Sequence, residues 1–284
     1  MVTGKRLEVK NLMSDYRFTE LGKETRYSDF YDPSLLCPIP RVKARQSKDK
    51  ALPFVGIDLW TAYELSWLNL DGLPQMAIVE FMIPCDSESI VESKSFKLYL
   101  NSFIQTQFAS MEAIHSQLVK DLSAATGAVV NVVLYEIAEY QGIQPVSEPK
   151  GLCIDRQSLV IDTYSPDPTL LATESNKQVS ETLYSHLLKT NCPVTDQPDW
   201  ASIYIFYKGS KIDRAGLLKY IVSYRQHQDF HEQCVEQIFV DIMAACSPTE
   251  LSVYARYLRR GGLDINPFRS NHCTHPPLFR QVRQ

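Results

Sequence analysis

A cysteine lies in a stretch of turn-forming residues, where a structural cysteine is not expected. The stretch TNCPVTDQPDW (190–200) holds Cys192 between an asparagine and a proline, with Asp199 seven residues later. Structural cysteines behave as small hydrophobes, whereas a thiolate adds to electrophilic carbon. A carboxyl group at Asp199, where the loop ends, could exchange a proton with the thiol. Cys192 is therefore a candidate nucleophile, and the alternative is a tight turn built from the same residue types.

A second candidate group lies in YRQHQDFHEQCVEQIF (224–239). His227, His231 and Cys234 have the i, i+4, i+7 spacing that would place three zinc ligands on one helical face. The Asp-Phe pair before His231 is typical of a helix boundary and would leave His227 outside the helix. In that interpretation Cys234 belongs to an apolar stripe, and His231 and Glu232 occupy the first helical turn, where a carboxylate is favoured.

Two charged segments complete the candidates. ESIVESKSFKLYL (88–100) places Glu92 and Lys94 before an apolar stretch, which is also compatible with a solvated hairpin. YLRRGGLDINP (257–267) places Arg260 beside Gly261, and a guanidinium next to a permissive backbone could bind phosphate. The alternative for this segment is an ordinary hairpin turn.

The elements that would position these residues follow from hydrophobic periodicity. Residues 95–103 alternate apolar and polar side chains, which predicts a half-buried strand. The two halves of the chain show the same order of elements and predict a duplication that aligns Cys85 with Cys192. The other predicted strands are 74–84, 127–137, 152–164, 179–189, 201–209, 250–258 and 262–268, and the predicted helices are 103–125, 214–226 and 230–246.

Composition limits the class of protein. The 284 residues suffice for one or two domains, and no apolar run approaches the roughly 20 residues of a membrane span. The seven cysteines form no C-x-x-C pair, which favours reduced thiols, and the N-terminus does not look like a signal peptide, so a cytoplasmic location is expected. The net charge of −4 argues against a broad phosphate-binding surface, and neither a G-x-G-x-x-G nor a P-loop is present.

Together the segments resemble one family, the NADPH-dependent 7-cyano-7-deazaguanine reductases, which are nitrile reductases of queuosine biosynthesis. The resemblance rests on LGKETRYSDFYDPSLLCPIPR, ESKSFKLYLNSF, TNCPVTDQPDW, DFHE and RRGGLDINPFRS. It runs nearly end to end at the length of the two-module form, and only Asp229 is looser, since asparagine is expected there.

The resemblance implies an α+β fold of tandem tunnelling-fold (T-fold) modules, each an antiparallel four-stranded sheet with two helices on one face. The expected divisions are an N-terminal arm and lead-in over 1–73, a first module over 74–164, a linker over 165–178 and a second module over 179–284.

The resemblance also implies the chemistry. Cys192 adds to a nitrile carbon to give a thioimidate, and Asp199 donates a proton to the nitrile nitrogen, with two NADPH used for each amine and no metal. A homodimer acting on a free small molecule, without direct contact to tRNA or a membrane, is expected. The residues implied in substrate binding are Val91, Glu92, Ser93, Phe230, His231 and Glu232, and those implied in NADPH binding are Ser93, Lys94, Arg260 and Gly261.

Two other functions compete with this interpretation. The tunnelling fold also hosts zinc-dependent cyclohydrolases that open guanine-type rings, an analogy from fold alone. A non-catalytic purine-binding module would need no reactive cysteine.

Overall fold

The computed structural model describes residues 27–45, 51–143, 146–147 and 150–284. Part of the expected arm, including all of LGKETR (21–26), lies outside the described residues. The strands are β1 (Pro38–Pro40), β2 (Val55–Leu68), β3 (Pro74–Pro84), β4 (Ser89–Val91), β5 (Asn131–Tyr135), β6 (Leu152–Cys153), β7 (Thr173–Asn191), β8 (Pro198–Ile212), β9 (Glu250–Tyr257) and β10 (Leu263–Ser270). The helices are α2 (Ser93–Asn101), α3 (Met111–Thr126), α4 (Ile137–Ile143), α5 (Arg214–Ser223) and α6 (His231–Cys246), with short 3-10 turns η1 (Pro33–Leu35), η2 (Arg41–Lys43), η3 (Pro168–Leu170) and η4 (Tyr224–Gln226).

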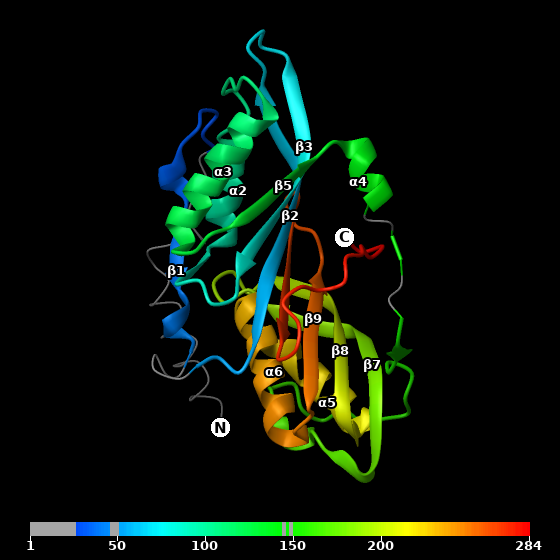
Figure 1. Ribbon diagram of the computed structural model, residues 1–284. Helices are drawn as coiled ribbons and strands as arrows, with labels where there is room; N and C mark the ends of the chain where they lie inside the picture. Colours follow the sequence, from blue (N-terminus) through cyan, green and yellow to red (C-terminus); the bar gives the residue numbers. More distant parts are fainter. Residues whose placement is uncertain (1–26, 46–50, 144–145, 148–149) are drawn as a thin grey trace.

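One long sheet runs through both halves of the chain. Its order is β5-β3-β2-β10-β9-β8-β7-β6, and every neighbouring pair is antiparallel except the short β6, which runs parallel to β7. Figure 1 shows α2 and α3 beside the part of the sheet formed by β2, β3 and β5, and α5 and α6 beside the part formed by β7 to β10. This is the expected α+β fold of tandem tunnelling-fold modules. Within the described residues the first module contributes three strands at its end of the sheet, because β6 pairs with the second module instead.

The two modules meet where β2 pairs with β10, from Ala62 opposite Leu263 to Val55 opposite Ser270. This seam requires a glycine at position 56. Gly56 has φ of +145°, and a Cβ added there would lie 2.1 Å from the backbone oxygen of Phe268. The strands can therefore approach this closely only because Gly56 has no side chain.

Each helix pair buries aromatic and aliphatic side chains against its part of the sheet. In the first module Phe96 of α2 packs edge-to-face on Trp60 and on Phe81, with ring centroids 5.1 Å apart in both pairs. In the second module Val235, Ile238, Phe239 and Ile242 of α6 belong to one buried cluster with strand residues of β8 and β9. No helix of the described residues is long and apolar enough to cross a membrane.

The strand predicted over 95–103 is wrong, because these residues lie mainly in α2. The side chain of Glu92 caps this helix by accepting hydrogen bonds from the backbone N–H groups of Lys94 and Ser95, at 2.7 and 2.8 Å. Phe96, Tyr99 and Phe103 are buried at the i, i+3, i+7 spacing of a helix. The alternation seen in the sequence was coincidental, and the predicted alignment of Cys85 with Cys192 fails with it.

Other predictions differ less. Of the strand predicted over 152–164 only Leu152 and Cys153 form a strand, and the helix predicted over 103–125 begins at Met111. The long strand β2 lies in the expected lead-in and was missed. The strand over 74–84 is confirmed, as are the strands within β7, β8, β9 and β10 and the helical character of 214–226 and 230–246.

Candidate active site

A cavity of about 230 Å³ lies where residues of both modules converge. Its wall includes the loop between β7 and β8, the start of α2, the start of α6 and the turn between β9 and β10. Nine of the eleven residues expected in the site line it, namely Val91, Ser93, Lys94, Cys192, Asp199, Phe230, His231, Glu232 and Arg260. The other two, Glu92 and Gly261, are the immediate chain neighbours of lining residues.

The loop that carries Cys192 is closed by its own backbone. The Cys192 N–H donates to the Gln197 carbonyl at 2.9 Å, and the Asp196 N–H donates to the Cys192 carbonyl at 3.1 Å. Asp196 adopts a left-handed conformation with φ of 57°. These contacts present the cysteine at the cavity wall, where it is partly exposed rather than part of the hydrophobic core.

Asp199 is the first acidic residue of β8 and is only 3% exposed. His231 Nε2 lies 3.3 Å from its Oδ2, and the Arg260 guanidinium pairs with its Oδ1. Burial alone would raise the pKa of Asp199, but the hydrogen bond from His231 and the charge of Arg260 outweigh it and lower the pKa. The side chain is therefore a carboxylate in this arrangement, able to accept a proton.

His231 begins α6 and is held by a ring that the sequence did not indicate. Its imidazole stacks on the buried Tyr257 of β9, with centroids 3.6 Å apart and planes within 2° of parallel. The His231 Nδ1 atom is buried and has no hydrogen-bond partner among the described residues. The stacking fixes the ring so that Nε2 faces Asp199.

Two buried carboxyl groups come from different modules. Glu92 is fully buried, and burial raises its pKa, although the backbone N–H groups that it caps partly offset this. Glu232 is 2% exposed, and its pKa is raised to about 7 by burial and by the charge of Asp58. Such groups can accept hydrogen bonds from the N–H donors of a bound base.

One side of the cavity is cationic. Lys94, Lys97 and Arg260 line it, and burial together with the charge of Arg260 lowers the pKa of Lys97. Gly261 has φ of +59°, and a Cβ added there would lie 3.3 Å from Lys97 Cδ. A glycine beside three cationic side chains leaves room for a phosphate-bearing group, so these residues fit the expected NADPH. Lys97 was not among the predicted site residues, although it lies within the ESKSFKLYL segment.

The alternative zinc ligands do not converge. His227 lies before the start of α6, where its Nε2 is 3.7 Å from Asp229, while Cys234 is buried in the core of the second module. Among the residues that the structure describes, no three His, Cys, Asp or Glu side chains are arranged to hold a metal ion.

Comparisons with known proteins give matches that cover most of the chain. A family model described as "Nitrile reductase, 7-cyano-7-deazaguanine-reductase N-term" matches residues 27–134, and one described as "QueF-like protein" matches residues 198–276. The NADPH-dependent 7-cyano-7-deazaguanine reductase of Cupriavidus metallidurans is 56% identical over 270 residues, which cover 93% of this chain and 97% of that protein. The protein of the same name from Saccharophagus degradans is 54% identical over 268 residues, with 93% and 98% covered. A solved structure of the archaeosine synthase QueF-Like in the apo form covers 35% of this chain and 99% of its own at TM-score 0.30 and 17% identity, which is too low to support an argument about the fold.

Proposed function

Because the chain belongs to the NADPH-dependent 7-cyano-7-deazaguanine reductase family, it is an oxidoreductase that acts on a nitrile, and we propose that Cys192, Asp199 and His231 carry the reaction. The substrate is 7-cyano-7-deazaguanine, the product is the primary amine 7-aminomethyl-7-deazaguanine, and two NADPH are used. The observation that carries the residue assignment is that Cys192, Asp199 and His231 line one cavity, with His231 Nε2 3.3 Å from Asp199 Oδ2.

In the first step the Asp199 carboxylate accepts the proton of the Cys192 thiol, and the thiolate sulfur adds to the nitrile carbon. One π pair of the C≡N bond moves to nitrogen, which takes the proton from Asp199, so the product is a neutral thioimidate bound to Cys192. His231 is placed to share this proton because its Nε2 lies 3.3 Å from Asp199. Covalent capture converts a triple bond into a C=N group and retains it in the site.

NADPH, when bound, supplies one hydride for each of the two reductions. Lys94, Lys97, Arg260 and Gly261 would hold it on the cationic side of the cavity, with Ser93 at the start of α2. After the first reduction the C–S bond must break, and Cys192 leaves as a thiolate that is reprotonated through Asp199. The cavity then has to retain the resulting imine until the second reduction.

Recognition of the base is assigned to both modules. Glu92 and Glu232 accept hydrogen bonds from its N–H donors, and Phe230 stacks on its ring, with Val91 and Ser93 completing the pocket. A base without those donors would leave buried carboxyl groups unpaired, which is costly and so provides specificity.

We also propose an oligomeric state, a cellular location and a domain division for the enzyme. It acts as a homodimer in the cytoplasm on the free base, without direct contact to tRNA, in keeping with its net charge of −4. The chain divides into the arm, two modules and the linker expected from its sequence, with two changes. β2 is counted in the first module because it pairs with β3, and residues 173–178 are counted in the second module because β7 begins at Thr173.

The test is a turnover assay with 7-cyano-7-deazaguanine as the only nitrile. Wild type should consume two NADPH for each amine formed, and Cys192→Ala should consume none, while Cys153→Ala, which changes an exposed cysteine, should retain activity. A covalent adduct of enzyme and nitrile in the intact mass spectrum would identify the thioimidate. Well-folded wild type that uses no NADPH would refute the reaction, and ring opening without NADPH would support the cyclohydrolase alternative.

A further inference from the structure

Residues 37–45, which we call the strap, lie against the first module just before its recognition residues. The strap contains β1, which pairs with β4 of the first module, so that Ile39 lies opposite Ile90 and Pro38 opposite Val91. The Glu92 N–H donates to the Cys37 carbonyl at 2.9 Å, and the Cys37 N–H donates to Ser95 Oγ at 3.0 Å. The backbone around Val91 and Glu92 is therefore held by the strap on one side and by α2 on the other.

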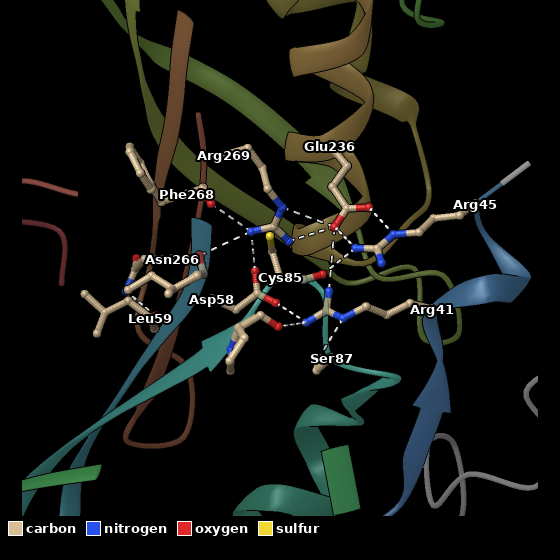
Figure 2. Close-up of polar contacts among 12 residues, drawn as sticks. Arg41, Arg45, Asp58, Leu59, Cys85, Ser87, Glu236, Asn266, Phe268 and Arg269 are labelled. Carbon is tan, nitrogen blue, oxygen red and sulfur yellow. Dashed lines mark hydrogen bonds and ion pairs between the residues drawn. The ribbon is translucent and has the colours of Figure 1, made fainter. Parts of the chain in front are cut away.

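The same strap reaches the second module through Arg45 (Figure 2). Its guanidinium forms a two-pronged contact with Glu236, from Nε to Oε2 at 3.0 Å and from Nη2 to Oε1 at 2.7 Å, and Nη2 also donates to the Cys85 carbonyl at 2.6 Å. Glu236 follows Glu232 by one turn of α6, so both side chains lie on the same side of the helix. Fixing Glu236 fixes the start of α6, where Glu232 and Phe230 face the cavity.

Arg41 and Arg269 complete the cluster that Figure 2 shows. Arg41 is 4% exposed and pairs with Asp58 of β2, while Arg269 of β10 lies 2.8 Å from both Asp58 and Glu236. Burial opposes ionisation of Glu236, but the charges of these arginines outweigh it and lower the pKa of that carboxyl group. A two-pronged charged contact of this kind is stronger and more directional than a neutral one.

A third contact of the strap is apolar. Ile39 and Ile90 are buried together, and Val194 of the nucleophile loop and Phe230 pack against them. The described contacts of the strap thus reach both recognition segments and the cysteine loop. Arg260, on the cationic side, pairs instead with Asp199 and Gln197.

We propose that the strap is a positioning element for the base, and that Arg45, through Glu236, holds Glu232 and Phe230 at the right distance from Val91 and Glu92. The proposal rests on the proposed function for the identity of the ligand. Among the described residues Arg45 contacts Glu236, the Cys85 carbonyl and the ring of Phe54, none of which belongs to the cationic side. Loss of the Arg45 contacts should therefore weaken binding of the base and leave NADPH binding nearly unchanged.

The test uses Arg45→Gln, because Arg45 reaches the surface and its loss leaves less buried charge unpaired than loss of Arg41 would. Dissociation constants for 7-cyano-7-deazaguanine and for NADPH are measured separately by calorimetry in a Cys192→Ala background, so that no covalent bond contributes. We expect the base to bind about tenfold more weakly and NADPH to change by less than about twofold, in line with losses seen when supporting contacts of a site are removed. Arg45→Lys, which keeps the charge without the fork, should recover part of the affinity. The matched control is Lys208→Gln, which removes one cation from the exposed pair with Glu250 and should change neither constant.

The outcomes separate a positioning role from a general loss of stability. Unchanged affinity for the base in folded Arg45→Gln would overturn the proposal even if the variant melts earlier. Equal weakening for the base and for NADPH would overturn it as well, since it would indicate a loosened fold. If Arg45→Gln does not fold, Arg45→Lys must still show the selective loss. Wild type that binds the base without reducing it would refute the proposed reaction, while the dissociation constants would still test the role of the strap. A Cys192→Ala parent that binds no base would refute both the proposed reaction and the role of the strap.

Discussion

Binding of the base should depend on pH because the cavity contains a buried carboxyl group with a raised pKa. The Glu232 side chain is 2% exposed, and burial first, then the charge of Asp58, raise its pKa to about 7. His231 beside it and Arg41 in the strap act in the opposite direction but do not cancel the shift. A carboxylate accepts hydrogen bonds from the N–H donors of the base, whereas the protonated acid must first release its proton.

The size of the effect follows from the titration. With a pKa of about 7, roughly one in eleven molecules has an ionised Glu232 at pH 6 and roughly ten in eleven at pH 8. The affinity for the base should therefore increase about tenfold from pH 6 to pH 8, which corresponds to about 1.4 kcal/mol. By linkage, binding should release about 0.9 proton at pH 6 and about 0.1 proton at pH 8.

Calorimetry in two buffers of different ionisation enthalpy measures both quantities at once, again in the Cys192→Ala background. Glu232→Gln should bind more weakly at pH 8 and should lose most of the pH dependence and proton release. Glu250→Gln, which changes a glutamate on the exposed end of β9, should retain both. Equal affinity at pH 6 and pH 8 in the Cys192→Ala parent, or an undiminished slope in Glu232→Gln, would refute the reasoning.

Three further predictions concern other parts of the structure. Asp199→Asn should slow formation of the covalent adduct by about 10²- to 10⁴-fold in single-turnover mass spectrometry, because the proton acceptor is lost, and an unchanged rate would exclude that role. Gly261→Ala should raise the KM for NADPH several-fold with the affinity for the base unchanged, since its methyl group would press on Lys97 from 3.3 Å at a φ of +59°, and an unchanged KM would remove this residue from the cofactor site. Gly56→Ala should lower the free energy of unfolding in urea by about 3 kcal/mol or more, because its Cβ would lie 2.1 Å from a backbone oxygen of the neighbouring strand. Gly72→Ala, at a φ of +81° with open space around it, is the matched control and should cost only about 1–2 kcal/mol, and equal losses would show that strain rather than contact is responsible.

Sequence periodicity predicted well those elements in which the buried side chains follow the period of a strand or of a helix. In β8 Ile203, Ile205 and Tyr207 are at most 1% exposed, and in α6 a full apolar stripe faces the sheet. The strand predicted over 95–103 is wrong because the apolar residues of α2 satisfy both the strand period and the helix period. The deciding feature was Glu92, whose capping of two backbone N–H groups starts a helix at Ser93.

The site was predictable only where its residues are close in sequence or lie in a recognised motif. Arg45 and Glu236 are 191 residues apart, and although Glu236 lies within the candidate segment 224–239, nothing in the sequence pairs it with Arg45. Tyr257 offers no sequence signal for its stack on His231, because that contact depends on how β9 lies against α6. Pairings of this kind arise from the packing of distant elements, which periodicity along the chain does not record.

The duplication is visible in the structure once the register is taken from the strands. The β2–β3 pairing shifts just before Leu65 meets Ala77, and the β7–β8 pairing shifts just before Leu188 meets Ala201. The following helices repeat the same buried contact. Tyr99 donates to Asp121 at 2.7 Å in the first module, and Tyr220 donates to Asp241 at 2.6 Å in the second. The sequence carries a matching pair of segments, since DPSLL begins one 3-10 turn and DPTLL the other, each capped by its aspartate.

This register explains why only one module can carry the nucleophile. Pro74 and Pro198 both begin the second strand of their hairpins, so the position of Asp199 is taken by Gln75 in the first module. The position after the first strand is Asn69 there instead of Cys192, and Met111 begins the helix that corresponds to α6. The first module has the same frame without these proton-transfer groups, and its first helix is capped by Glu92, whose chain neighbours Val91, Ser93 and Lys94 line the cavity, whereas α5 is capped by Asp213. The cavity is therefore lined by residues of both copies, Cys192, Asp199 and His231 from the second and Val91, Ser93 and Lys94 from the first, and the pairing of β2 with β10 joins the two copies in one sheet.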